Sequence, residues 1–426
     1  MEFLADLHIH SRYSRACSAS LCPEELHRWG LLKGLRVLAT GDFTHPAWLA
    51  ELEEKLTPAE EGLLRLKPEL AAAVDARIPA SCRGQVRFLL GTEISCIYKR
   101  GGKVRKVHNL VYVPSFAAAR KLRARLEKIG NLRSDGRPIL GLDSRDLLEL
   151  VLDSDPRSYL VPAHAWTPHF AVFGSASGFD ALEDCFGDLT QHIFSLETGL
   201  SSDPEMNWRL SALDDLSLIS NSDAHSPEKL GREANIFDTE LSYDGIFEPL
   251  KKKDLSRFFG TLEFFPEQGK YHVDGHRNCQ VRMDPAETLR RKGLCTSCGK
   301  PVTVGVLHRV EKLADRPLGN RPASAPGFEK LVPLKDILSQ ALQVGPSSKK
   351  VAALYTRMLE RFGPELDILR KLDMKVLESE GYALPALAIG RMRAGRASMA
   401  PGYDGEFGTV SLLSEPDFAD TKRIPA

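Results

Sequence analysis

The sequence predicts an α/β barrel, a small zinc module and a C-terminal helical domain, in that order along the chain. Three observations support this architecture: seven strand-like stretches that each end in a histidine or an acidic residue, a Cys-x-x-Cys motif with an upstream His-x-x-Cys, and apolar residues at helical spacing beyond them. A chain of 426 residues is long enough for two or three domains. We expect the barrel to span residues 1–262, the zinc module 263–325, the helical domain 326–410 and a disordered tail 411–426.

The strand-like stretches of the first domain carry potential metal ligands at their carboxyl ends. In a barrel of parallel strands these ends meet at one mouth, whatever their distance along the sequence. Imidazoles and carboxylates are ligands for Zn²⁺, Mn²⁺, Fe or Mg²⁺. The pattern is typical of a multi-metal hydrolase, and the ligands expected at the mouth are His8, His10, Asp42, His45, Glu93, His108, His164, Asp223 and His225.

Two of these strand ends carry ligands two residues apart. Residues at positions i and i+2 of an extended strand point to the same face, so His8 and His10 can bind one ion together. Asp223 and His225 repeat the spacing at another strand end. A single His-x-His pair also arises by chance or as two hydrogen-bonded polar residues, and the second pair argues against both alternatives. Asp6 shares the strand face of the histidines and is expected to orient a ligand.

Segments between the ligand-bearing strands are expected to build and cover the barrel. Residues 48–56 and 58–76 are rich in Leu, Glu, Ala and Lys, and Thr57 with Glu60 forms a capping-box pattern, so both stretches are predicted to be helices of the barrel wall. Residues 173–180 are rich in glycine and serine and follow a ligand-bearing strand. This segment is either a mobile loop or a loop that shapes a substrate pocket.

The Cys-x-x-Cys motif marks the second domain. It lies about fifteen residues beyond the His-x-x-Cys pair, a spacing typical of a tetrahedral structural zinc site. The four expected zinc ligands are His276, Cys279, Cys295 and Cys298. His272 or His308 is an alternative fourth ligand. A redox-active Cys-x-x-Cys is the rival interpretation, although no thioredoxin-like βαβ pattern surrounds the motif.

The second domain is locally basic. Residues 277–316 contain nine Lys or Arg against four Asp or Glu, an excess of five positive charges. Small zinc modules often lie against nucleic acid, so this excess favours a DNA partner. A zinc-stapled spacer between two domains is the alternative.

The third domain is predicted from helical periodicity. Residues 334–342, 347–362 and 364–377 carry apolar side chains at helical spacing and are separated by Gly-Pro breaks. Few apolar residues follow Ser411, so the last residues are expected to form a poorly ordered tail.

The composition narrows the class of protein. Hydrophobic residues make up 42%, as in an ordinary globular protein, and the formal net charge is zero, so any contact with nucleic acid must be local. No apolar run approaches the roughly 20 residues that span a bilayer, and the first strand begins too early for a signal peptide. We therefore expect a cytoplasmic protein without a membrane partner, whose eight cysteines are thiols or metal ligands rather than disulfides.

The ligand pattern resembles the polymerase-and-histidinol-phosphatase (PHP) superfamily. The residues that match its motifs, in order, are His8 with His10, Glu93, His108, His164, and Asp223 with His225. The resemblance implies a distorted (β/α)7 barrel that holds two or three divalent metals. The second motif departs from the superfamily pattern, because Asp42 and His45 are not adjacent, so either residue is a candidate ligand.

The order of the three domains resembles the endonuclease Q family of DNA-repair enzymes over most of the chain. The resemblance rests on residues 41–46, 166–168, 174–180, 197–204, 271–279, 295–301, 305–310 and 313–316. It implies cleavage of the phosphodiester bond 5′ to uracil, hypoxanthine, xanthine or an abasic site, with a 3′-hydroxyl and a 5′-phosphate as products. It also implies damaged DNA, double- or single-stranded, as the partner, and a sliding clamp is a further candidate partner.

Roles at the mouth follow from the chemistry of phosphodiester hydrolysis. Paired metals ~3.5–4 Å apart activate the attacking water and stabilise charge on the phosphate and the leaving oxygen. Glu93 is the central acid among the imidazoles and is expected to bridge two metals. The catalytic residues are expected to be Glu93, Asp223, His225 and His8. Glu197 either orients a ligand or is a buried structural carboxylate.

A damaged base must leave the helix stack to be read in a pocket. We expect Phe173 or Phe179 to stack on that base, while backbone groups of glycine and serine approach it closely. Replacing either phenylalanine should then weaken cleavage at uracil more than at an abasic site. The residues expected to contact the substrate are Trp166, Phe173, Gly174, Ser175, Gly178, Phe179 and Arg309.

Two other classes of function remain open. A PHP-type phosphoesterase that acts on a small phosphorylated molecule would share the metal ligands but would need neither the zinc module nor the helical domain. A non-catalytic DNA-binding protein with a degenerate barrel is opposed by the number of ligand residues that are present.

Overall fold

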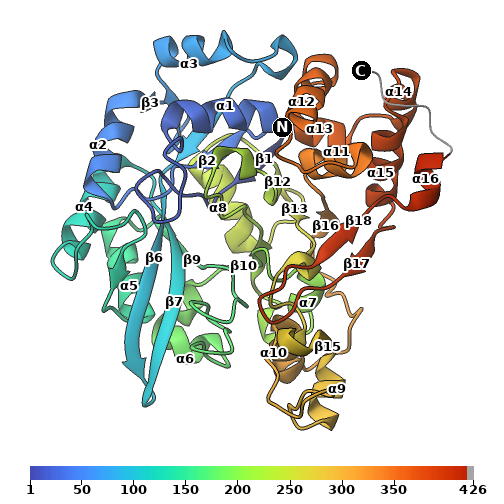
Figure 1. The fold of residues 1–426 in the computed structure, drawn as a ribbon. Helices are drawn as coiled ribbons and strands as arrows, with labels where there is room; N and C mark the ends of the chain where they lie inside the picture. The colour runs from blue at the N-terminus through green and yellow to red at the C-terminus, as the bar shows by residue number, and fades with distance from the viewer. Residues whose placement is uncertain (420–426) are drawn as a thin grey trace.

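The computed structural model describes residues 1–419 as a mixed α/β structure, as the sequence predicts (Figure 1). Its largest sheet has eight strands. In spatial order they are β16 (Gly327–Lys330), β13 (Phe258–Glu263), β12 (Ala234–Asp238), β1 (Glu2–Asp6), β2 (Val37–Ala39), β5 (Arg87–Leu89), β4 (Leu64–Leu66) and β3 (Leu56–Pro58). The central strands β1, β2 and β5 are parallel, whereas β12 is antiparallel to β1.

A second sheet and a strand pair complete the first domain. The sheet contains β8 (Ile139–Leu140), β6 (Gly91–Arg100), β7 (Lys103–Tyr112) and β9 (Tyr159–Pro162), and the parallel pair consists of β10 (Ser195–Glu197) and β11 (Ser217–Ile219). Side chains from all three sheets share one apolar core, among them Val37, Tyr112, Val161 and Ile219. The closed (β/α)7 barrel is not confirmed, because the strands within residues 1–419 form separate hydrogen-bonded sheets.

Helices pack around these sheets. They are α1 (Pro23–Lys33), α2 (Pro46–Lys55), α3 (Pro68–Asp75), α4 (Phe116–Leu126), α5 (Ser144–Ser154), α6 (Leu182–Phe186), α7 (Pro204–Asn207) and α8 (Tyr243–Lys252). The helix predicted over residues 58–76 is shorter than expected. Its first half is the β3–β4 hairpin, in which Leu64 pairs with Phe88 of β5, so burial of the leucines against the sheet overrides the capping-box pattern.

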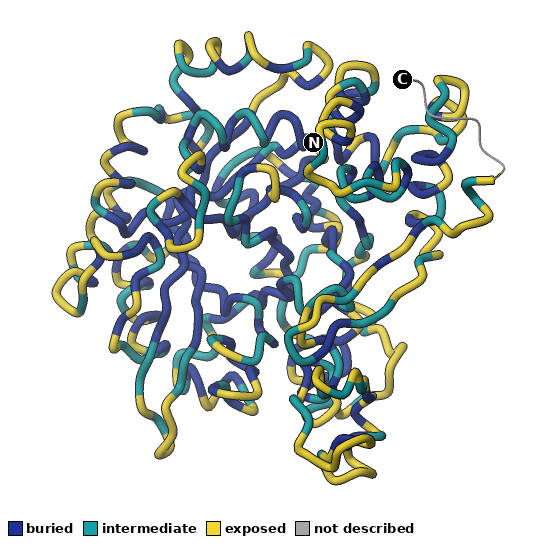
Figure 2. Tube along the Cα trace, viewed as in Figure 1, coloured by how far each residue is buried: buried dark blue, intermediate teal, exposed yellow. Residues whose placement is uncertain are grey.

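The chain leaves the large sheet after β13 and rejoins it with β16. The excursion contains β14 (Asp274–His276), β15 (Val281–Met283), α9 (Pro285–Arg290) and α10 (Val306–Leu313). It projects from the body of the molecule, and much of the chain at its tip is exposed (Figures 1 and 2). We call these residues, 264–326, the cysteine module.

The helical region contains α11 (Leu334–Leu342), α12 (Lys349–Phe362), α13 (Glu365–Arg370), α14 (Met374–Ser379) and α15 (Ala383–Arg393). It docks on α1 through the buried carboxylate of Glu365, which pairs with Lys33 at 2.7 Å and accepts a hydrogen bond from Tyr355 at 2.8 Å. Within residues 1–419, no helix combines the length and apolar character needed to cross a membrane.

The chain then descends to the cysteine module and returns as a hairpin of β17 (Ser398–Ala400) and β18 (Thr409–Ser411), followed by α16 (Glu415–Ala419) (Figure 1). Tyr403 of this hairpin forms a bridge with Val273 of the module. Leu412 is buried, and its N–H donates to Gln340 at 2.8 Å. The predicted disordered tail therefore does not hold for residues 411–419, and residues 420–426 lie outside the described part of the chain.

Candidate metal centres

Three candidate ligands follow their strands in a left-handed backbone conformation. Asp42, His164 and Asp223 have φ angles of 48°, 30° and 47°. Such angles are strained for residues other than glycine and tend to cluster at functional sites. The three residues follow β2, β9 and β11, and their side chains contact His10 or Glu93.

His8, His10 and Asp223 form the first group of potential ligands. A bridge between Ile9 and Ala224 holds the two segments parallel, and the His10 N–H donates to the Ala224 carbonyl at 3.2 Å. The Asp223 Oδ1 atom lies 3.0 Å from His10 Nε2 and 3.6 Å from His8 Nε2. The two i, i+2 histidines thus face one carboxylate, as the strand geometry predicts.

Glu93, His108 and His164 form the second group. On the β6–β7 hairpin His108 lies opposite Ser95, two residues after Glu93, so Glu93 and His108 share one face of the sheet. The Glu93 Oε1 atom is 2.6 Å from His108 Nδ1 and 3.1 Å from His164 Nε2. Burial lowers the pKa of His108 to about 4, so its ring is neutral at pH 7 and able to bind a metal.

Glu93 lies between the two groups. While Oε1 faces the second group, Oε2 lies 3.4 Å from His10 Nε2 and 3.7 Å from His8 Nε2. Burial alone would raise the pKa of this carboxyl, but its interactions with His108, Arg137 and His8 hold the pKa well below its ordinary value. Glu93 thus has one carboxylate oxygen beside each group, and its role as a bridge remains a prediction. We call the six residues of the two groups the cage.

A carboxylate fixes the ring of His8 from behind. Glu197 accepts from His8 Nδ1 at 3.0 Å, and also from the His164 N–H and from Asn221 Nδ2 at 2.7 and 2.8 Å. His8 Nε2, on the opposite side of the ring, is buried and forms no hydrogen bond. A histidine held by a carboxylate, with its other nitrogen free, is the usual arrangement of a metal ligand. The cage therefore fits divalent cations.

Asp42 plays the same part for His10. Its Oδ1 lies 3.2 Å from His10 Nδ1, while Oδ2 accepts from the N–H and hydroxyl of Ser11 and from the Ser14 hydroxyl. All of its oxygen contacts are therefore within the protein, and Asp42 lies outside both ligand groups. Asp42 is placed to orient a ligand rather than to be one.

His45, the other candidate in this motif, is turned away from the cage. Its Nδ1 caps α2 by accepting from the Trp48 N–H at 3.4 Å, and its Nε2 lies 3.2 Å from the Arg133 carbonyl. The ring stacks on Tyr13 at a centroid distance of 4.4 Å. With both nitrogens engaged, His45 is not available as a ligand, and its place among the expected ligands is corrected.

His225 and Asp6 lie near the cage but outside both groups. The His225 ring is 4.7 Å from the His10 ring, and its Nδ1 lies 2.8 Å from the Asp223 carbonyl. Asp6 accepts from the N–H groups of Ser222 and Gly231 at 3.0 and 2.9 Å. Asp6 thus positions the backbone before Asp223 rather than a ligand side chain.

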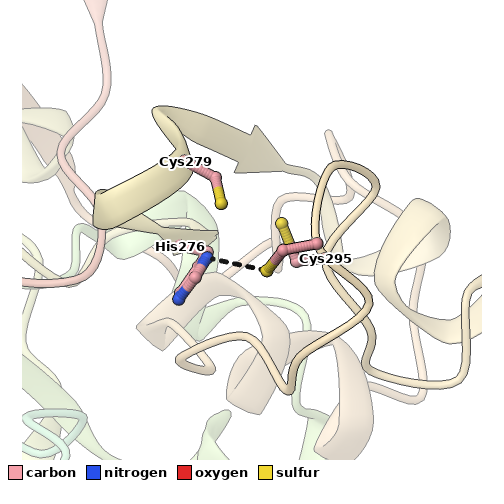
Figure 3. A group of neighbouring side chains, drawn as sticks. His276, Cys279 and Cys295 are labelled. Carbon is pink, nitrogen blue, oxygen red and sulfur yellow. Dashed lines mark hydrogen bonds between the residues drawn. The ribbon is translucent and has the colours of Figure 1, made fainter.

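The predicted zinc ligands His276, Cys279, Cys295 and Cys298 also come together. Figure 3 shows the first three of them side by side. Cys298 Sγ lies 3.5 Å from His276 Nδ1. Hydrogen bonds from the backbone N–H groups of Cys298 and Ser297 lower the pKa of the Cys295 thiol to about 6, which favours the thiolate that binds zinc. We call these four residues the cysteine cluster.

The alternative fourth ligands are elsewhere. His308 Nδ1 lies 2.7 Å from the Asp274 carboxylate, and His272 is buried beneath a cleft. Neither belongs to the cysteine cluster.

A cleft of about 950 Å³ is lined at one side by residues that contact the cage and at the other by residues of the cysteine module. At the cage it is lined by Thr167, whose hydroxyl lies 3.1 Å from His164 Nδ1, and by Arg232, which donates to the Ser222 carbonyl at 2.8 Å. Farther out it is lined by the aromatic residues Phe264, Tyr271 and Phe407. The cleft is large enough to admit a nucleotide-sized group beside the cage.

Comparison with known proteins relates this architecture to a family. A family model described as the MJ0043 C-terminal domain matches residues 333–396. The uncharacterized protein MJ0043 of Methanocaldococcus jannaschii is 32% identical over 256 residues, which cover 58% of this chain but only 31% of that protein. The chain thus spans about a third of that relative.

Two solved structures are similar over the whole chain. The lesion-specific endonuclease PfuEndoQ from Pyrococcus furiosus superposes with a TM-score of 0.84 at 29% identity, over 99% of this chain and 100% of that one. Endonuclease Q in complex with a 27-mer duplex, with an abasic lesion at the active site, superposes with a TM-score of 0.83 at 29% identity, over 99% of both chains. The chain is thus similar to endonuclease Q structures over almost its whole length, as the sequence resemblance implies.

In this protein, the aromatic residues expected to stack on a base are buried. Trp166, Phe173 and Phe179 are 0%, 2% and 3% exposed. Phe173 packs against Trp166 with ring centroids 4.9 Å apart, and Phe179 packs between Tyr98 and Arg105. The expected base stacking by Phe173 or Phe179 is corrected, because neither ring is accessible to a ligand.

The other expected substrate contacts hold the loop in place. Arg309 of α10 donates to the carbonyls of Phe173 and Phe179, both at 2.8 Å. Gly174 and Gly178 allow close backbone contacts, since a Cβ on either would lie 2.6 Å or less from a backbone atom. Ser175 alone among the seven is exposed. The loop is thus a packed joint between the first domain and the cysteine module.

Arg137 is a cage contact that the sequence analysis missed. Its Nη1 atom donates to Glu93 Oε2 at 3.0 Å. It lies in a loop between α4 and β8 and belongs to no strand end, motif or periodic pattern. Only the neighbouring Gly-Arg-Pro sequence marks the position as a turn.

Proposed function

We propose that this protein is a metal-dependent DNA-repair endonuclease that nicks the strand 5′ to a deaminated base (uracil, hypoxanthine or xanthine) or an abasic site. The observation that carries the proposal is the pair of ligand groups on either side of Glu93, next to residues that line a nucleotide-sized cleft. Similarity over 99% of the chain to a lesion-specific endonuclease supports DNA as the substrate. A cytoplasmic enzyme that acts on the chromosome would fit this role, and a sliding clamp is not part of the proposal.

The proposed reaction is hydrolysis of one phosphodiester. The oxygen of a water molecule forms a bond to phosphorus, the bond between phosphorus and the O3′ atom of the preceding nucleotide breaks, and O3′ takes up a proton. The products are a 3′-hydroxyl and a 5′-phosphate on the nucleotide that carries the lesion. Divalent cations would lower the pKa of the water and polarise the phosphate.

The protein's own residues would hold and tune that centre. His8, His10 and Asp223 would bind on one side of Glu93, His108 and His164 on the other, and Glu93 would serve both sides. Carboxylates behind the rings of His8 and His10 keep their free nitrogens directed into the cage. We keep His225 as a further ligand at the rim, where its side chain is 35% exposed.

The cleft gives the lesion a place to bind. A damaged or missing base pairs weakly, so its nucleotide leaves the stack at low cost. Phe264, Tyr271 and Phe407 line the cleft and offer aromatic surface for such a nucleotide. The zinc-binding cysteine module, with an excess of positive charge, would hold the duplex beside it.

The test uses four duplexes that carry one uracil, one hypoxanthine, one abasic site or no lesion. Each is incubated with purified protein and Mg²⁺, Mn²⁺ or Zn²⁺, and the ends of any nick are identified. We expect a nick 5′ to the lesion with a 3′-hydroxyl, and no nick in the undamaged duplex. Hydrolysis of p-nitrophenyl phosphate without cleavage of any duplex would contradict the proposal and favour a small-molecule phosphoesterase.

A further inference from the structure

Within residues 1–419, Arg137 is the one arginine or lysine whose side chain forms an ion pair with a carboxylate of the cage. Its guanidinium donates to Glu93 Oε2 at 3.0 Å, and its side chain is 25% exposed. The residue is therefore neither buried in a structural ion pair nor free in solvent. It lies at the boundary between the cage and the space in front of it.

The backbone holds this arginine in place. The Asp135 carboxylate accepts from the N–H groups of Arg15 and Arg137, both at 3.2 Å, and the Gly136 N–H donates to the Tyr13 carbonyl at 2.9 Å. A Cβ at Gly136 would lie 2.3 Å from Asp42 Oδ2, so only glycine lets the loop approach this closely. The carboxylate that orients His10 and the loop that carries Arg137 thus form one rigid unit.

The charges around Arg137 favour an anion. Arg137 pairs with Glu93, but divalent cations in the cage would share the same carboxylate, so a further negative group beside the arginine would reduce the repulsion between these positive charges. Within residues 1–419, the Arg137 guanidinium forms an ion pair or hydrogen bond with Glu93 alone, so the other N–H groups of its planar fork remain available. A guanidinium fork matches two oxygens of a phosphate.

We propose that Arg137 is a catalytic residue that contacts a non-bridging oxygen of the scissile phosphate and stabilises the negative charge that develops there. This inference rests on the proposed function and adds a residue to it. The guanidinium stays protonated throughout the reaction and supplies no proton. Its effect is electrostatic and is strongest in the transition state, when charge on the equatorial oxygens is greatest.

The first experiment separates catalysis from DNA binding. Single-turnover cleavage of a duplex with one abasic site is measured for Arg137→Ala, Arg137→Lys and Arg133→Ala. Arg133 is the matched control, because it lies in the same loop with a side chain that is 73% exposed. We expect Arg137→Ala to lower the cleavage rate about 100-fold. The rate of Arg137→Lys should lie between those of Arg137→Ala and wild type, and the rate of Arg133→Ala should equal that of wild type. Loss of duplex affinity with an unchanged cleavage rate would overturn the proposal.

The second experiment detects a direct contact with the phosphate. The scissile phosphate is replaced by each phosphorothioate diastereomer, in which sulfur takes the place of one non-bridging oxygen. If Arg137 contacts one of these oxygens, the cost of Arg137→Ala differs between the two diastereomers. Equal costs would show a structural effect and would overturn the proposal.

Two further measurements do not depend on DNA cleavage. Elemental analysis should find the same ion content in Arg137→Ala and wild type, and ion loss would show that the arginine merely supports Glu93. Inorganic phosphate should bind the metal-loaded wild-type protein at least tenfold more tightly than Arg137→Ala, and equal affinities would refute the contact. If phosphate binding behaves as expected but no lesion duplex is nicked, then the proposed function fails while the role of Arg137 in holding a phosphate stands.

Discussion

The two candidate metal sites differ in what holds their ligands. In the cage, His8, His10 and Glu93 are at most 2% exposed, and carboxylates from other elements fix the histidine rings. In the cysteine cluster Cys298 is exposed, and the pKa of Cys295 is lowered by backbone N–H groups of its own turn. The cage is shaped by the surrounding fold, whereas the cysteine cluster belongs to a small module with little core of its own.

This difference indicates two kinds of metal site. A site that the fold pre-shapes can keep its geometry while a substrate enters, which is what catalysis requires. A tetrahedral Cys and His site on a small module instead supplies folding energy through the ion. Removal of ions should therefore abolish catalysis at the cage without unfolding the first domain, but should destabilise the fold of the cysteine module.

The largest effect is expected for Glu93→Gln. The substitution removes the charge shared by both ligand groups, so we expect ions to leave both sides and lesion nicking to fall by more than about 100-fold, the upper figure for a residue that only orients a ligand. Elemental analysis and single-turnover cleavage provide the measurements. Glu380→Gln is the control, because that carboxylate pairs with Arg361 in the helical region and contacts no residue of the cage. Full ion content with undiminished nicking would show that Glu93 is no bridge.

The next effect concerns the cysteine cluster. Cys295→Ser should release one equivalent of zinc and make residues 264–326 sensitive to limited proteolysis, while the cage keeps its ions. Cys22→Ser, which changes a half-buried thiol before α1, serves as the control. Loss of cage ions from Cys295→Ser would mean that the two sites are not independent.

A moderate effect is expected for the carboxylate behind His8. Glu197→Gln places an amide NH₂ among three donors, His8 Nδ1–H, the His164 N–H and the Asn221 amide. We expect the affinity of the cage for metal to fall 10- to 100-fold, with the zinc of the cysteine cluster as an internal control. Metal affinity is measured by competition with a chelator. An unchanged affinity would contradict the claim that Glu197 orients the His8 ring for metal binding.

The smallest effect is expected for His45→Asn. Asparagine is a good N-cap, so α2 keeps its first hydrogen bond. Ion content should match wild type and nicking should stay within about twofold, because His45 has no nitrogen directed at the cage. A tenfold loss of nicking together with ion loss would restore His45 as a ligand.

Sequence patterns anticipated the sites where the geometry is local or set by strand ends. The cysteine cluster follows from spacing alone, and the i, i+2 rule brought His8 and His10 to one carboxylate. The ambiguity between Asp42 and His45 could not be resolved in this way, because it depends on which residue follows the left-handed turn and which one caps α2.

The sequence-based predictions that were wrong, and the contact that was missed, depend on tertiary contacts that no local pattern encodes. Residues 56–66 show helical signals yet form a hairpin, since Leu64 pairs with a strand more than twenty residues away. Phe173 and Phe179 look like exposed loop aromatics, but Arg309, from a segment over a hundred residues later, holds their backbone against the core. Arg137 reaches Glu93 from an irregular loop whose position depends on Gly136 and Asp135.

The most direct test of the central claim is anomalous diffraction from crystals of the protein grown with Mn²⁺ and Zn²⁺. The account predicts one ion within binding distance of His8, His10 and Asp223, a second within binding distance of His108 and His164, and Glu93 bound to both. A separate zinc should lie in the cysteine cluster. If zinc were found in the cysteine cluster alone, with no density on either side of Glu93 in crystals of a protein that nicks damaged DNA, the cage would not be the catalytic centre.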